Sequence, residues 1–269
     1  MPGLSGFLLI NPRSGKGGPT PEELRDEAAS RGIEARILGE DDDASELAHS
    51  ADADALGIAG GDGSLAQIAE VAIERELPFV CIPFGTRNHF ARDLGLDRDD
   101  PLAALDAFRG TERRIDLGLV GDRVFLNNVT FGVYASLVHR RESHRRRREA
   151  FARLRALLLT IANREPLGLV IDDEPVDAQV AVVSNNDYTL ELLSLGERER
   201  LDEGLLHLYL APGWRVSEWD ERASASLTVD AARHRIKAAV DGEPAVFETP
   251  LAFSIQPLAL RVLVPPAQG

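Results

Sequence analysis

The sequence of 269 residues contains a single cysteine, Cys81, which excludes an intramolecular disulfide and any metal site built from several thiolates. Cys81 lies in the apolar run PFVCIP, which is typical of a buried strand, so we expect it to fill core space. No apolar run approaches the roughly 20 residues needed to cross a bilayer, and the N-terminal GFLLI is too short for a secretory signal. These absences predict a cytoplasmic protein with no transmembrane segment.

A net positive charge is also lacking, since 44 acidic residues outnumber 30 Lys and Arg and give a formal net charge of −14, which argues against nucleic acid as a partner. The local exception is HRRESHRRRRE at 139–149, beside an apolar stripe in a helix that we expect near 142–163. Such a stretch fits docking on anionic lipid headgroups at the inner membrane face, although a solvated helix face is the alternative. Trp214 and Trp219 could contact membrane or fill the core.

Residues 1–115 alternate between strand and helix patterns. The expected strands GFLLI, IEARIL, ALGIA and PFVCIP are separated by helical stretches, and Leu65, Ile68, Ala69 and Ala72 follow the helical period. Another helix is expected from Pro21, a good first helical residue, to Gly32, a good stop. This alternation predicts an α/β domain with a Rossmann-like parallel sheet and helices on both faces. Ligands then bind at the carboxyl ends of the strands.

Residues 116–269 read mainly as strands separated by turn signals such as DDEP and DGEP. They predict a β-rich substrate-binding domain, either an antiparallel sandwich or a barrel. The pattern leaves open whether the last strand packs back on the first domain. Free strand edges in such a domain would allow a homodimer.

Three glycine-rich turns follow three of the expected strands: NPRSGKGG at 11–18, GGDGS at 60–64 and PFGTRN at 83–88. Glycines let backbone N–H groups approach a phosphate, and a helix that follows points its positive end at the same place. Hydroxyls of Ser14, Ser64 and Thr86 could add hydrogen bonds. A single loop of this kind could be a tight turn and nothing more, but three at successive strand ends indicate a phosphate-binding edge.

Two common phosphate-binding motifs do not fit. The first turn lacks the Walker A glycine five residues before Gly15, and no Ser or Thr follows Lys16. The residues from Gly61 to Ala66 formally match the dinucleotide fingerprint, but the acidic residue expected about 20 positions later is missing, because that region reads CIPFGT. A redox enzyme is therefore excluded.

The motifs NPRSGKGG, GGDGS and IPFGTRNHFARDLGL, in this order and spacing, resemble the diacylglycerol kinase catalytic domain family. That family includes bacterial lipid kinases and sphingosine kinases and is more distantly similar to NAD kinases. The later landmarks IDLGLV, RVFLNNVTFGVYA, VVSNN, DEGLLHLYL and DGEPA extend the resemblance over essentially the whole chain.

The resemblance implies an ATP-dependent lipid kinase. It would hold ATP with Mg²⁺ in a cleft between the two domains and phosphorylate a lipid hydroxyl at the membrane surface, diacylglycerol or a relative. The residues implied to bind the nucleotide are Asn11, Ser14, Gly15, Gly60, Gly61, Asp62, Gly63, Ser64, Thr86 and Asn88. Ser64 stands where threonine is usual, and it keeps the hydroxyl.

Two carboxylates compete for the role of catalytic base. Asp62 matches the position favoured in sphingosine kinases and NAD kinases, and Glu243 matches the glutamate taken as base in bacterial diacylglycerol kinases. We favour Glu243 as the base, with Asp62 holding magnesium or positioning the hydroxyl. Removing either carboxylate is expected to abolish turnover and leave the fold intact.

Two positions depart from the family pattern. His89 and Glu203 stand where bacterial members have aspartates of a structural magnesium network, although Asp202 precedes Glu203. A neutral imidazole and a longer acid weaken a site for a hard cation, so Glu203 remains a candidate metal ligand in an altered site.

Two other functions stay open. The first is a kinase with the same loops that phosphorylates NAD or a polyol, and it predicts activity without lipid. The second is a regulatory protein that binds a nucleotide without catalysis.

Overall fold

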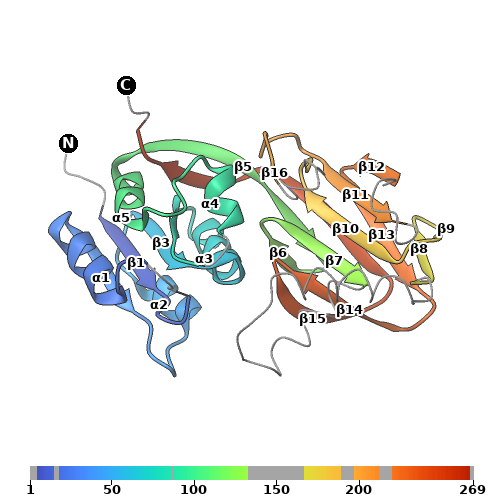
Figure 1. Ribbon diagram of the computed structural model, residues 1–269, viewed down its shortest axis with the longest axis horizontal. Coiled ribbons are helices and arrows are strands. Elements are labelled where there is room, and N and C mark those ends of the chain that lie inside the picture. Colours follow the sequence, from blue (N-terminus) through green and yellow to red (C-terminus); the bar gives the residue numbers. More distant parts are fainter. Residues whose placement is uncertain are drawn as a thin grey trace. The chain divides into compact units, whose positions relative to one another are not determined.

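The computed structural model describes residues 5–14, 18–85, 88–132, 167–188, 197–211 and 220–266 (Figure 1). The described residues fall into two compact units. Unit 1 takes those within 1–117, 188–202 and 257–269, and unit 2 takes those within 118–187 and 203–256. The chain thus leaves unit 1 after Leu117, close to the boundary expected at residue 115. It returns in residues within 188–202, which the expected division did not include, and within 257–269, where the sequence left open that the last strand packs back.

Unit 1 is built on a parallel sheet in the order β2–β1–β3–β4, followed by the end of the last strand. Its strands are β1 (Gly6–Ile10), β2 (Ile33–Ile37), β3 (Ala55–Gly60) and β4 (Phe79–Pro83). Every residue of β1, β3 and β4 is buried. Because successive side chains point to opposite faces, both faces of the sheet must be covered, as the predicted Rossmann-like arrangement requires.

Helices supply this cover: α1 (Pro21–Ser30), α2 (Ala44–Ser50), α3 (Asp62–Glu74), α4 (His89–Asp93), α5 (Pro101–Ala104) and the 3₁₀ turn η1 (Leu105–Arg109) (Figure 1). The helix expected from Pro21 is confirmed. Its N-cap Thr20 and Glu23 form a capping box, with hydrogen bonds of 3.1 and 2.7 Å. One core cluster joins Leu24 of α1 and Phe108 of η1 to strand residues such as Leu8 and Val80.

Unit 2 is an antiparallel β-sandwich, in agreement with the prediction. One sheet has six strands in the order β12–β11–β10–β7–β14–β15. These are β12 (Asp220–Ser224), β11 (Leu206–Ala211), β10 (Val180–Asn185), β7 (Asn128–Gly132), β14 (Arg235–Val240) and β15 (Glu243–Glu248). The facing strands are β8 (Leu169–Ile171), β9 (Glu174–Val176), β13 (Ser226–Ala231) and the start of β16. Phe131 and Phe253 meet edge to face in the core, with ring centroids 6.1 Å apart.

Two long strands take part in both units. In unit 2, β16 (Leu251–Val264) pairs antiparallel with β13, and in unit 1 its Val262 pairs parallel with Phe79 of β4. The last strand therefore contributes to the sheet of unit 1, a point that the sequence left open. The other long strand, β5 (Thr111–Val120), pairs with β6 (Arg123–Phe125).

Several expectations fall outside the described residues, namely the helix near 142–163, the basic stretch at 139–149, Trp214 and Trp219. Among the residues that the structure describes, no helix is long and apolar enough to cross a membrane.

Candidate active site

The three glycine-rich turns lie at one edge of the unit 1 sheet. They follow β1, β3 and β4, which run parallel, so their carboxyl ends meet at the same edge. Backbone hydrogen bonds tie the turns together, because Asn11 N–H donates to Ala59 C=O over 2.9 Å and Phe84 N–H donates to Gly60 C=O over 3.3 Å. Gly15 and Thr86 are outside the described residues.

Glycine is required at positions 60 and 85, because these turns pack too closely there for a Cβ atom. A Cβ placed on Gly85 would lie 2.5 Å from Gly61 Cα and 2.8 Å from Asn88 Oδ1. A Cβ on Gly60 would collide with Ser64 Oγ. Absent side chains therefore allow close packing of the loops and leave backbone at the surface that a ligand would meet.

Helix α3 begins in the second turn and points its N-terminus into this edge. Its N-cap is Gly61, which supplies no side-chain hydrogen bond, and its first residues are Asp62 and Gly63. Ser64 Oγ donates to Gly61 C=O over 2.9 Å. The N-cap of this 13-residue helix supplies no side-chain hydrogen bond, so backbone N–H groups stay available at its positive end, beside the Asp62 carboxylate of the first turn. Such an end suits a phosphate that binds together with a divalent cation.

The carboxylate of Asp62 has a structural task in addition to any catalytic one. Its two oxygens accept the backbone N–H groups of His89 at 3.3 Å and Phe90 at 3.2 Å. The N-cap of α4, Asn88, makes no side-chain cap of its own. Asp62 therefore caps α4 from the neighbouring loop.

Asn88 holds the third turn in place. Its backbone is left-handed, with φ of 50°, and only 5% of its surface is exposed. Its Oδ1 accepts Gly85 N–H over 2.8 Å, and its Nδ2 donates to the carbonyls of Gly85 and Arg98. The amide thus shapes the loop, and direct contact between Asn88 and a nucleotide stays a prediction.

A cavity of about 430 Å³ adjoins the first turn. Its lining includes Asn11, Arg13, Gly39, Asp42 and Gln67. Asn11 Oδ1 accepts Arg13 N–H over 3.0 Å, and Ser14 N–H donates to Asn11 C=O over 3.2 Å, so both closing groups of this turn come from Asn11. The volume suits a nucleoside-sized group.

The far wall of this cavity is acidic, with Glu40, Asp41, Asp42 and Asp43. A hydrogen bond from Gly39 N–H, together with the Arg36 guanidinium, lowers the pKa of Asp42. A wall of four acidic side chains disfavours a phosphate group, so the base or ribose of a nucleotide suits this part of the cavity better.

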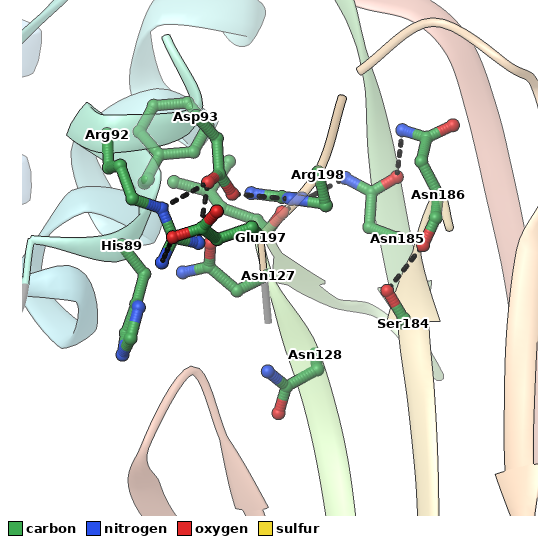
Figure 2. A network of polar contacts seen from close by, with 12 residues as sticks. His89, Arg92, Asp93, Asn127, Asn128, Ser184, Asn185, Asn186, Glu197 and Arg198 are labelled. Carbon is green, nitrogen blue, oxygen red and sulfur yellow. Dashed lines mark hydrogen bonds and ion pairs between the residues drawn. The ribbon is translucent and has the colours of Figure 1, made fainter. Parts of the chain in front are cut away.

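A buried ion network fixes α4 within unit 1 (Figure 2). Asp93, at the end of α4, pairs with Arg198 over 2.8 Å, and both side chains are fully buried or nearly so. Arg92 adds a second ion pair to Asp93 at 2.8 Å and one to Glu197 at 3.4 Å. No local pattern in the sequence indicates this pairing, because Asp93 and Arg198 are 105 positions apart.

In unit 2, the DGE motif forms the turn between β14 and β15. Asp241 and Gly242 both have positive φ, of 48° and 87°, as a two-residue hairpin turn requires. The buried Asp241 carboxylate accepts the N–H groups of Leu126, Asn127 and Asn128 over 2.7–3.0 Å. Glu243, the first residue of β15, is exposed. Asp241 thus anchors the turn, and the role of Glu243 as base stays a prediction.

Buried amides extend this polar region of unit 2. Asn185 N–H donates to Asn127 C=O over 3.0 Å, and Asn185 Nδ2 donates to Leu126 C=O over 3.1 Å. Asn186 Nδ2 donates to Asn185 Oδ1, and Ser184 Oγ donates to Asn186 C=O (Figure 2). Ser184, Asn185 and Asn186 belong to the motif VVSNN, which the sequence marked as part of the family resemblance but to which it assigned no role.

Glu203 lies in unit 2 beside the end of β10. Its carboxylate accepts Asp187 N–H over 3.0 Å and lies 3.4 Å from His207 Nε2, while its own N–H donates to Asn186 Oδ1. Asp202, the preceding residue, pairs instead with Arg200 at 3.1 Å.

The residues of unit 1 fit the phosphates of ATP with a divalent ion. A loop cradle that a Cβ would fill and a helix N-terminus that no side chain caps suit phosphate. The half-buried carboxylate of Asp62 at the same place is an oxygen ligand of the kind that Mg²⁺ prefers.

Comparisons with known proteins agree with this geometry. The model of the diacylglycerol kinase catalytic domain matches residues 5–120. A "Probable lipid kinase YegS-like" protein of Pseudomonas aeruginosa (strain UCBPP-PA14) is 31% identical over 274 aligned positions, which cover 88% of this chain and 86% of that protein. One of the same name from Pseudomonas fluorescens (strain Pf-5) is 41% identical over 110 residues, covering 39% of this chain and 36% of that protein.

Among solved structures, a diacylglycerol kinase from Bacillus anthracis (strain Sterne) superposes with a TM-score of 0.71. It covers 97% of both chains at 17% identity and therefore supports the fold alone. The extended match to the Pseudomonas aeruginosa relative, together with the domain match, confirms what the motifs implied: the chain belongs to the diacylglycerol kinase catalytic domain family.

Proposed function

We propose that the protein is an ATP-dependent lipid kinase that transfers the γ-phosphate of ATP to a hydroxyl of diacylglycerol or a related lipid. The observation that carries this proposal is the N-terminus of α3, which no side chain caps and which glycine turns frame at the carboxyl edge of the sheet. Membership of the family supports the reaction class, and the names of the relatives support a lipid as acceptor.

In this proposal unit 1 binds the nucleotide. The backbone of the second turn and the dipole of α3 hold the phosphates, with hydroxyls of Ser14 and Ser64 as additional donors. Mg²⁺, when bound, would neutralise charge on the phosphates, and Asp62 is the carboxylate that we propose as its ligand. Gly15 and Thr86 belong to the same proposed set.

Unit 2 supplies the base. The acceptor hydroxyl loses its proton to Glu243 while its oxygen bonds to the γ-phosphorus, and the bond from that phosphorus to the bridging oxygen breaks to release ADP. Glu243 suits this role because it is exposed at the end of a turn that Asp241 anchors with three hydrogen bonds. We further propose that the enzyme works at the membrane surface as a peripheral protein.

The test is phosphoryl transfer from labelled ATP with magnesium. One set of reactions offers diacylglycerol and other lipid alcohols in mixed micelles, and another offers NAD or glycerol without lipid. We expect a labelled lipid product from the wild-type protein and from Glu248→Gln, which changes an exposed glutamate at the other end of β15. We expect none from Glu243→Gln.

Three results would overturn parts of the proposal. Transfer to NAD or glycerol alone would remove the lipid acceptor. Binding of ATP without transfer to any acceptor would favour the regulatory protein. Full transfer by both Glu243→Gln and Asp62→Asn would remove the assignment of the site.

A further inference from the structure

A histidine surrounded by three carboxylates lies in unit 2, among residues that the proposed kinase reaction does not use. Asp187 follows β10, His207 lies in β11 and Glu221 lies in β12, three strands that are neighbours in the six-stranded sheet (Figure 1). Asp187, His207 and Glu221 each offer one ligand atom, and these atoms all lie within 4.8 Å of one another. Glu203 completes the cluster at 3.4 Å from His207 Nε2.

The strand register places these side chains on one face. In LHLYL of β11 the leucines enter the sandwich core, so His207 and Tyr209 point to the opposite face. Glu221 pairs directly with Tyr209 and is the diagonal neighbour of His207 across β11 and β12. Glu221 therefore lies on the same face as the imidazole.

The imidazole presents one nitrogen to two carboxylates and the other nitrogen to the third. Its Nδ1 lies 3.0 Å from Glu221 Oε1 and 3.7 Å from Asp187 Oδ1. Its Nε2 faces Glu203 and, among the described residues, makes no hydrogen bond although it is buried. The His207 side chain is only 10% exposed, so Nε2 needs an acceptor, and Glu203 is the carboxylate that faces it. With the proton on Nε2, the lone pair of Nδ1 points towards two carboxylates, which is unfavourable unless a cation lies between them.

Negative charge predominates in the cluster. Three carboxylates surround an imidazole that offers at most one positive charge. Within the described part of the chain, no arginine or lysine forms an ion pair with Asp187, Glu203 or Glu221. The neighbouring Arg222 pairs with Glu174 and Asp220. A divalent cation would supply the missing charge.

Hydrogen bonds already orient the ligands. Tyr209 O–H donates to Asp187 Oδ1 over 2.6 Å, and Glu203 accepts Asp187 N–H over 3.0 Å. Metal-binding histidines usually donate their second N–H to a carboxylate, and Glu203 stands at the place that this arrangement requires.

We propose that His207 Nδ1, Asp187 and Glu221 bind a divalent transition-metal ion of the Zn²⁺ type, with Glu203 accepting the N–H of His207 Nε2. One imidazole and two carboxylates suit Zn²⁺ with a water as fourth ligand, and the imidazole disfavours Mg²⁺ and Ca²⁺. The ion joins the loop after β10 to the edge strand β12. Glu203 then acts as a positioning residue, and the metal differs from the magnesium that ATP requires.

The test uses the full chain after treatment with EDTA and without nucleotide. Calorimetric titration with Zn²⁺ and with Mg²⁺ gives the stoichiometry and the affinity, and thermal unfolding gives the stabilisation. We expect Zn²⁺ to bind the wild-type protein and to raise its Tm, and Mg²⁺ to do so much less. His207→Gln and Glu221→Gln are expected to lose one bound Zn²⁺, and Glu203→Gln to bind it about 10–100-fold more weakly.

His234→Gln is the matched control, because His234 lies in the same unit, is exposed and faces a single carboxylate, Glu248, at 4.0 Å. It is expected to bind Zn²⁺ as the wild-type protein does. If His207→Gln does not fold, the half-exposed Glu221 provides the decisive variant. Retention of the same Zn²⁺ binding in Glu221→Gln, absence of Zn²⁺ binding by the wild-type protein, or equal stabilisation by Mg²⁺ would overturn the site.

Discussion

A Cβ atom built on Gly85 would stand 2.5 Å from the Cα of Gly61, whereas a Cβ built on Gly61 would stand 3.7 Å from the Cα of Gly85. The first distance is a collision with backbone, and the second is an ordinary van der Waals contact. The two glycines that bring the second and third turns together therefore differ in their tolerance of a methyl group.

Gly85→Ala should consequently force the turns apart, with a loss of stability of roughly 1–3 kcal/mol and a larger loss of ATP binding. Gly61→Ala should cost about 1 kcal/mol at most, as expected for alanine at an N-cap. Urea unfolding and nucleotide titration of both variants measure the difference. Equal losses in the two variants would contradict this account of the loops.

Asp62→Asn tests a carboxylate with two tasks. Because Asp62 caps α4 through His89 and Phe90, its replacement should lower the free energy of unfolding by about 0.5–2 kcal/mol, in addition to abolishing turnover. A loss of this size is compatible with the expectation from sequence that the fold stays intact, and it adds a measurable cost in stability. Thermal unfolding beside the transfer assay separates the two effects, and unchanged stability would show that the cap is unimportant.

Glu243→Gln should affect chemistry alone. The Glu243 side chain is exposed and makes none of the hydrogen bonds through which Asp241 anchors the DGE turn. The free energy of unfolding of the variant should therefore differ from that of the wild-type protein by about 0.5 kcal/mol or less. Turnover should fall by at least about 100-fold if Glu243 is the base. Substantial turnover, with loss of turnover confined to Asp62→Asn, would transfer the role of base to Asp62.

Asp241→Asn should do the reverse and damage the fold of unit 2. Asn has one acceptor oxygen where Asp241 has two, and its NH₂ group would face a backbone N–H donor. At least one buried N–H group then loses its acceptor, which should lower the free energy of unfolding by roughly 1–3 kcal/mol. Asp173→Asn, in the exposed turn before β9, is the control, and we expect it to change little. Urea denaturation of both variants gives the comparison.

The sequence predicted the edge at which the three glycine-rich turns meet, because the signals for strands and turns are local. Hydrophobic runs fixed the positions of β1, β3 and β4, and the glycines that follow them marked the turns. The pairing of Asp93 with Arg198 could not be predicted from sequence. It forms because a segment within 188–202 folds back into unit 1, and Arg198 lies 105 positions after Asp93. In the DGE motif, the resemblance drew attention to Glu243, while Asp241 makes its contacts with residues more than 110 positions away.

The lone cysteine gives a last test of the core of unit 1. Burial strongly raises the pKa of the Cys81 thiol, and the negative charge of Asp62 adds to this effect. Since the thiolate is the reactive form, Cys81 should resist a thiol reagent in the folded protein at pH 8 and react fully in denaturant. Because the chain has one cysteine, the labelled fraction reports this site alone. Fast labelling of the folded protein, at a rate above that of global unfolding, would mean that β4 opens locally and that the sheet edge behind the phosphate-binding turns is less rigid than its complete burial indicates.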